Sequence, residues 1–196
     1  MPLWGDRMRF SVKKITLMAV LTASALIIFI IEAQIPLPIP IWGVKLGLAN
    51  SVTLFALFYR RTDRAERSAQ SGSRANRSED EAALTTVDAL LILICRIILG
   101  AVFTGRLVTF AFSLSGGLLG FAAQAVMRRL VSDRQIWVCG AVGAVFHNIG
   151  QILAAMLITG TPAIAAYLPV LIAAGLITGV ITGFVAQITL SRIRRS

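Results

Sequence analysis

The sequence predicts an all-α membrane protein, a bundle of about six transmembrane helices with both termini in the cytoplasm. Hydrophobic residues make up 57% of the chain and charged residues only 14%, and the mean hydropathy is +0.81. A soluble domain contains about 45–50% apolar and about 25% charged residues. Several apolar runs have about the 20-residue length of a helix that crosses a bilayer core, and basic residues gather at the ends of these runs.

The apolar runs lie near 15–34, 46–60, 84–104, 107–127, 136–159 and 166–190. Because lipid offers no hydrogen-bond partners, the backbone of such runs must be helical rather than open strand. The second run is short, which allows a tilted or partly re-entrant segment. The first run follows lysines, as a secretory signal does, but no convincing cleavage site follows it, so we interpret it as a helix. We expect one transmembrane domain over 15–190, between cytoplasmic tails at 1–14 and 191–196.

The basic residues that flank the runs predict the orientation. Most of the 19 basic residues lie before the first run or after the second, fourth and sixth runs: Arg7, Arg9, Lys13, Lys14, Arg60, Arg61, Arg64, Arg67, Arg74, Arg77, Arg128, Arg129, Arg134, Arg192, Arg194 and Arg195. Lys45 and Arg106 fall on the opposite side. We therefore expect a multi-pass protein of the cell membrane with both termini inside. The net charge of +10 indicates topology and contact with membrane lipid, not nucleic acid.

Two connections differ from the apolar runs in composition. Residues 60–81 read RRTDRAERSAQSGSRANRSEDE, a polar stretch that cannot bury enough surface to fold, and predict a disordered cytoplasmic loop over 60–82. The outer connection, 35–45, has proline at every second position from 36 to 40, which excludes a helix. It is either an apolar flap over the outer mouth of the bundle, with Trp42 at the membrane interface, or a plain connector.

Polar side chains within the runs are candidate binding residues, because an ionisable group at membrane depth is costly and usually faces the bundle interior or a cavity. Arg96 lies near the middle of its run. Asp88 is two turns earlier on another face, and Glu32 is near the outer end of its own run, so no carboxylate is expected at the depth of Arg96. Arg96 either bonds to helix carbonyls or awaits an anionic group.

The stretch VFHNIGQ, residues 145–151, contains the one histidine of the chain. His147 and Gln151 are spaced i, i+4 and share a helix face, while Asn148 lies about 100° away, close enough to line the same wall. These side chains either hydrogen-bond to neighbouring helices or contact a polar ligand. Gly150 permits close approach by a backbone or by a ligand.

Small residues predict where helices pack closely. Glycine recurs at every fourth position from 175 to 183, which predicts a flat helix face inside the bundle. Ala19 and Ala23 form a similar step on the first run. Cys95 and Cys139 lie in apolar runs without a Cys-x-x-Cys spacing, so they are interpreted as packing residues, and neither metal nor cofactor is indicated.

Five motifs in order carry a family resemblance. They are GVKLGLAN at 43–50, RIILG at 96–100, SLSGG at 113–117, GAVFHNIGQ at 143–151, and YLP at 167–169 before the glycine-rich last run. Together they resemble the Gx transporter family, often labelled heptaprenyl diphosphate synthase component I. The resemblance spans roughly residues 13–190, and the segment 60–81 looks like an insertion into the family pattern.

The resemblance implies a six-helix fold similar to the substrate-capture (S) components of energy-coupling-factor transporters. Such subunits bind a vitamin-like molecule from outside, beneath the loop after the first helix. The Ala19 and Ala23 pair resembles the contact with which they dock on a transmembrane coupling subunit that acts with two cytoplasmic ATPases. The chain has no G-x-x-x-x-G-K-[ST] phosphate loop, so energy is expected to come from these partners.

We expect a substrate-binding membrane subunit, not an enzyme. The ligand is expected to combine an anionic or strongly polar group with an apolar portion, as a vitamin, quinone precursor or isoprenoid phosphate does. The predicted ligand-binding residues are Arg96, His147, Asn148 and Gln151, with Lys45, Asn50 and Trp42. The alternative is a membrane accessory of a soluble prenyl synthase subunit, because chain elongation itself needs Asp-rich clusters that hold Mg²⁺. A purely structural bundle is the third interpretation.

Overall fold

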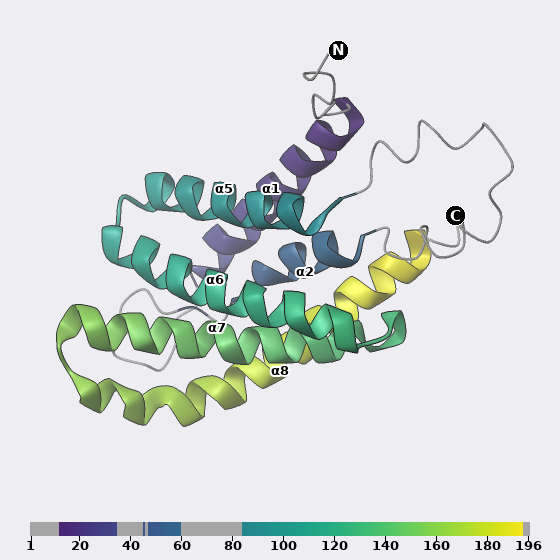
Figure 1. Cartoon of the computed structure of the whole chain (residues 1–196). Coiled ribbons are helices and arrows are strands. Elements are labelled where there is room, and N and C mark those ends of the chain that lie inside the picture. Colours follow the sequence, from purple (N-terminus) through teal and green to yellow (C-terminus); the bar gives the residue numbers. More distant parts are fainter. Residues whose placement is uncertain (1–11, 35–44, 46, 60–83, 194–196) are drawn as a thin grey trace, which may run out of the picture.

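The computed structural model describes residues 12–34, 45, 47–59 and 84–193, which form helices joined by short turns (Figure 1). The helices are α1 (Val12–Glu32), α2 (Asn50–Phe58), α5 (Thr86–Thr104), α6 (Leu107–Leu130), α7 (Ile136–Thr159) and α8 (Leu168–Ile193), with the short 3₁₀ helices η2 (Asp133–Gln135) and η3 (Pro162–Tyr167). No strand occurs in these ranges. Apart from Lys45, the proline-rich connection and the Arg/Ser-rich segment predicted above lie outside the described residues.

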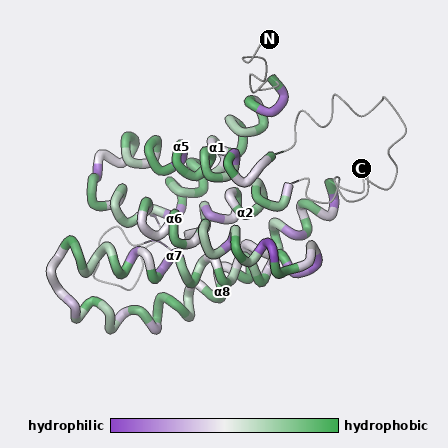
Figure 2. The backbone as a smooth tube through the Cα atoms, in the orientation of Figure 1, coloured by the Kyte–Doolittle hydropathy of each residue, from purple (hydrophilic) through white to green (hydrophobic). Residues whose placement is uncertain are grey.

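In the described part of the chain, five stretches are long and apolar enough to cross a membrane: α1, α5, α6, α7 and the continuous stretch Pro162–Ile193 formed by η3 and α8. In Figure 2, green marks hydrophobic residues, and it occurs along all of these helices. Many large apolar side chains on them are exposed, including Leu107, Leu157 and Ile177. Because exposed apolar surface on this scale is unfavourable in water but not in lipid, these observations confirm the predicted all-α membrane bundle.

The second predicted helix is shorter than the range 46–60 expected for it. Helix α2 has nine residues, about 14 Å of helix against a bilayer core of about 30 Å. It is buried on most of its surface, from Asn50 to Phe58, as expected for a helix enclosed by other helices. The described residues thus contain five helical stretches of full span length and one enclosed helix of about half that length, which agrees with the shortness of the second apolar run.

Helix α7 packs between α6 and α8. Towards α8, a Cβ at Gly179 would lie 2.7 Å from the Gly140 carbonyl oxygen. Towards α6, a Cβ at Gly150 would lie 2.7 Å from the Ser115 carbonyl oxygen. Neither place has room for a side chain, so backbone packs on backbone. The predicted glycine face at 175–183 is thereby confirmed as an interior packing surface.

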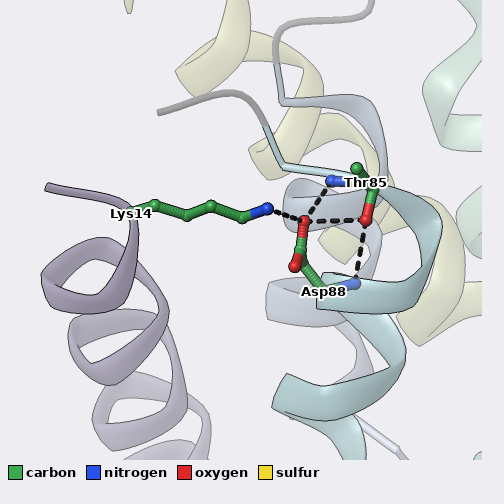
Figure 3. Close-up of polar contacts among 3 residues, drawn as sticks. All are labelled: Lys14, Thr85 and Asp88. Carbon is green, nitrogen blue, oxygen red and sulfur yellow. Dashed lines mark hydrogen bonds and ion pairs between the residues drawn. The ribbon is translucent and has the colours of Figure 1, made fainter. Parts of the chain in front are cut away.

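Helices α1 and α5 begin at the same end of the bundle. The ammonium of Lys14, near the start of α1, lies 2.8 Å from a carboxylate oxygen of Asp88, in the first turn of α5 (Figure 3). Asp88 also accepts a hydrogen bond from the Thr85 backbone N–H, while the Thr85 hydroxyl accepts one from the Asp88 N–H. This reciprocal cap starts α5, and Asp88 is thereby engaged far from Arg96, as its spacing predicted.

Two apolar cores lie one behind the other along the bundle. One gathers Leu54, Leu57, Ile92 and Leu190 with their neighbours, and the other gathers residues around Phe112. On α7, Cys139 belongs to the first core and Ile152 to the second. The polar residues of α7 lie between these two positions, so the candidate site is enclosed by apolar packing on both sides along the helix.

Candidate functional site

Six polar side chains from four helices and one turn are buried together between the two apolar cores. We call them the polar cluster: Glu32 from α1, Lys45 from the turn before α2, Asn50 from α2, Arg96 from α5, and His147 and Gln151 from α7. None is more than 8% exposed. Three of them carry formal charges, in a part of the molecule where each charge needs a partner.

The turn before α2 is anchored by two long-range hydrogen bonds. The Lys45 backbone N–H donates to Gln151 Oε1 at 3.0 Å, and the Gly47 N–H donates to Glu32 Oε1 at 2.5 Å. Gly47 has φ of +80°, and a Cβ there would lie 2.8 Å from His147 Cδ2. Non-helical backbone inside a membrane protein needs such internal partners, and the side chains of α1 and α7 supply them here.

Arg96 and Lys45 approach the same part of the site. The Arg96 Nη2 donates to Asn50 Oδ1 at 3.2 Å. The Lys45 ammonium lies 3.1 Å from the centre of the Phe29 ring, and the Arg96 guanidinium carbon lies 6.0 Å from it. Both cations thus face one aromatic ring, which offers partial compensation for lost water. Among the described residues, neither cation forms an ion pair with Glu32.

The hydrogen bonds of the turn determine the protonation state of His147. A backbone N–H can only donate, so the Gln151 atom facing Lys45 is the amide oxygen. The other Gln151 atom is then the NH₂ group, which lies 2.6 Å from His147 Nε2. Because that group donates, Nε2 must accept, and the imidazole is neutral with its proton on Nδ1. His147 therefore adds no charge to the polar cluster.

Buried donors within the polar cluster exceed the acceptors available to them. Four nitrogens of the polar cluster have no hydrogen-bond partner among the described residues: Lys45 Nζ, Arg96 Nε, Asn50 Nδ2 and His147 Nδ1. An unsatisfied buried donor costs on the order of 1–3 kcal/mol, and more for a charged group. All four donors come from positions that the sequence analysis singled out, and together they suit a ligand rich in acceptor oxygens.

Burial lowers the pKa of Lys45 to about 8. Loss of water around the ammonium is the main cause, the charge of Glu32 opposes it, and the positive charge of Arg96 adds to it. The ammonium is therefore still protonated at neutral pH and loses its proton in mildly alkaline solution.

The structure separates Asn148 from the other predicted site residues. Its Nδ2 donates to the Leu171 carbonyl oxygen on α8 at 2.6 Å, and Gly175 makes room for the side chain. Asn148 thus joins α7 to α8, on a different side of α7 from the contact between His147 and Gly116. Trp42 lies outside the described residues, while Ala19 and Ala23 are exposed on α1.

Sequence reasoning did not include Glu32, Phe29 and Gly47 in the site. A carboxylate in an apolar run was the available signal for Glu32, but its position at the end of α1 suggested a separate depth. Phe29 is indistinguishable from core residues by type. The positive φ of Gly47 and its contact with α7 depend on how the turn folds back, which no local pattern reveals.

The fold and the polar cluster define a multi-pass α-helical membrane protein with a charged, buried, donor-rich centre. Its sequence matches the family model described as heptaprenyl diphosphate synthase component I over residues 21–66 and 81–189. This is more than half of the chain, and the chain belongs to the heptaprenyl diphosphate synthase component I family. The unmatched residues 67–80 fall within the segment interpreted above as an insertion. No curated protein and no solved structure matches the chain.

Proposed function

We propose that the protein is a membrane subunit that captures a small, partly apolar ligand with an anionic group at the polar cluster. The observation that carries the proposal is the set of four buried donors without acceptors, on Lys45, Arg96, Asn50 and His147. A ligand with negatively charged oxygens satisfies donors that the described protein leaves unpaired, and the Phe29 ring and the adjacent apolar cores suit its apolar part.

The proposed subunit does not act alone. The predicted partners are a transmembrane coupling subunit and cytoplasmic ATPases of the energy-coupling-factor type. Ala19 and Ala23 are exposed on α1, so this step of small residues allows a close helix contact with another membrane protein. Ligand entry from the outside and the absence of catalysis remain predictions.

Replacement of Arg96 tests this function. Arg96→Met is expected to abolish retention of small molecules that stay bound while the protein is extracted from its native membrane, because it removes one of the two cations from the polar cluster. Arg106→Met is the matched control, since Arg106 is exposed in the turn between α5 and α6. Mass spectrometry of both purified variants measures the bound molecules. Equal retention by Arg96→Met and the parent would contradict the proposed site.

The family name favours a second candidate function, a membrane accessory of a soluble prenyl synthase subunit. In this interpretation the protein brings the synthase to the membrane surface, and the polar cluster has a structural role. The same native extraction distinguishes the two. Recovery of a soluble prenyl synthase with the parent and with Arg96→Met alike would favour the accessory role, whereas recovery of a coupling subunit with ATPases would favour the transporter role.

A further inference from the structure

We propose that the polar cluster selects a ligand whose polar group carries a single negative charge, such as a carboxylate, over a diphosphate. The inference rests on the proposed function and narrows its substrate class. It follows from counting the buried charges, from the hydrogen bonds that decide the charge of His147, and from the engagement of Glu32 by the turn.

The first step is the charge of the polar cluster. Lys45 and Arg96 each contribute one positive charge. Glu32, whose Oε1 accepts the Gly47 N–H as an ionised carboxylate does, contributes one negative charge. His147 is neutral, because its Nε2 accepts from Gln151. Asn50 and Gln151 carry no charge. The polar cluster therefore has a net charge of one positive unit when no ligand is bound.

The second step is the cost of an unbalanced charge at this depth. All members of the polar cluster are at least nine-tenths buried, and a net charge is strongly unfavourable in such surroundings. One negative charge brings the site to neutrality. A diphosphate carries at least two at neutral pH and would leave the site with a net negative charge. Electrostatics alone thus favours the monoanion.

Glu32 is held in place, so its negative charge continues to offset one of the two positive charges when a ligand binds. Its carboxylate accepts the Gly47 N–H at 2.5 Å, so displacing it would leave a backbone donor of the turn unpaired. Glu32 thereby acts as a fixed counter-charge. A ligand therefore binds at a site with a net charge of one positive unit, not two, although both Lys45 and Arg96 offer it hydrogen-bond donors.

Three probes with the same ten-carbon isoprenoid chain test the inference: the carboxylate, the monophosphate and the diphosphate. Their dissociation constants are measured by equilibrium dialysis at pH 7 with the full-length protein in a neutral detergent. The carboxylate is expected to bind at least ten-fold more tightly than the diphosphate. Glu32→Gln raises the net charge to two and is expected to shift this ratio at least ten-fold towards the more highly charged probes.

Asp88→Asn is the matched control for Glu32→Gln. It removes the carboxylate that pairs with Lys14 at the end of the bundle and is expected to leave the ratio unchanged. A parent protein that prefers the diphosphate, or a ratio unaffected by Glu32→Gln, would overturn the charge inference alone, provided binding still depends on Arg96. Absence of any Arg96-dependent binding would overturn both this inference and the proposed function.

A pH series on the parent protein provides a second measurement, which does not depend on whether Glu32→Gln folds. The carboxylate probe is fully ionised above pH 7, and the groups facing Lys45 are Glu32 and Arg96. Because the pKa of Lys45 is about 8 in the free protein, its charge disappears above that pH. Affinity for the carboxylate is expected to fall about 30-fold between pH 7 and 9.5. A flat profile would overturn the role of the lysine charge.

Discussion

At the scale of single residues, Gly47 links the turn to the rest of the polar cluster. It needs the left-handed conformation, with φ of +80°, and it also needs to lack a side chain, because His147 lies against its Cα. Its N–H reaches Glu32 while the neighbouring Lys45 N–H reaches Gln151. Gly47 thus allows the backbone N–H groups of this turn to reach acceptors on two helices, α1 and α7.

Comparing Gly47→Ala with a second glycine variant separates the steric requirement at Gly47 from the conformational one. Gly105→Ala is the control, since Gly105 has φ of +62° and nothing near its missing Cβ. The control is expected to lose about 1 kcal/mol of stability from backbone strain alone. Gly47→Ala is expected to lose more and to weaken ligand binding, because His147 must move. Thermal unfolding in detergent measures both, and equal losses would contradict the close contact.

At the scale of elements, α7 serves both packing and the site. One side of it carries Gly140 against α8, another carries Gly150 against α6, and His147 and Gln151 reach the turn before α2. Small residues on two sides allow its neighbours to come close. The position of the polar side chains therefore depends on backbone packing along the whole helix.

Gly179→Leu tests the contact between α7 and α8. The added Cβ alone would lie 2.7 Å from the Gly140 carbonyl oxygen, so the helices must separate, at a cost on the order of 2–3 kcal/mol. Ala173→Leu adds the same side chain at an exposed position of α8 and is expected to be nearly neutral. Melting temperatures in detergent compare the two variants. Similar stabilities would show that the contact is looser than described.

At the scale of the whole molecule, the described helices bring the end of α8 to the same end of the bundle as the start of α1. The Lys14–Asp88 pair places the starts of α1 and α5 together at one end of the bundle. Helices α5 to α8 then alternate in direction through short connections. The starts of α1 and α5 and the end of α8 therefore share one end of the bundle.

Cysteine labelling tests the predicted orientation of this end towards the cytoplasm. In a chain with Cys95 and Cys139 replaced by alanine, one new cysteine is placed at Ser132, between α6 and α7, or at Thr161, between α7 and η3. A membrane-impermeant maleimide on intact cells is expected to label Thr161→Cys, whereas Ser132→Cys reacts only after the cells are broken. Labelling of Ser132→Cys in intact cells would reverse the predicted orientation.

Much of the site could be predicted from residue type and spacing. Arg96, His147 and Gln151 are polar groups in apolar runs, and membrane depth makes such groups informative. Asn148 has the same signal, yet it bonds to the Leu171 carbonyl on α8. A rotation of about 100°, the angle between successive helix residues such as His147 and Asn148, separates these outcomes. The helix that each side of α7 meets is not encoded in the local pattern.

By itself, the sequence determined that the chain lies in a membrane, where its helices are, and where helices pack closely. Apolar runs in lipid must satisfy their own backbone, and glycine at every fourth position removes the side chains between two helices. Only the tertiary structure decided that α2 is half-length and that Glu32 belongs to the polar cluster. The physical reason is that the amides before α2 find their partners far away in the chain, 15 residues back at Glu32 and 106 residues ahead at Gln151.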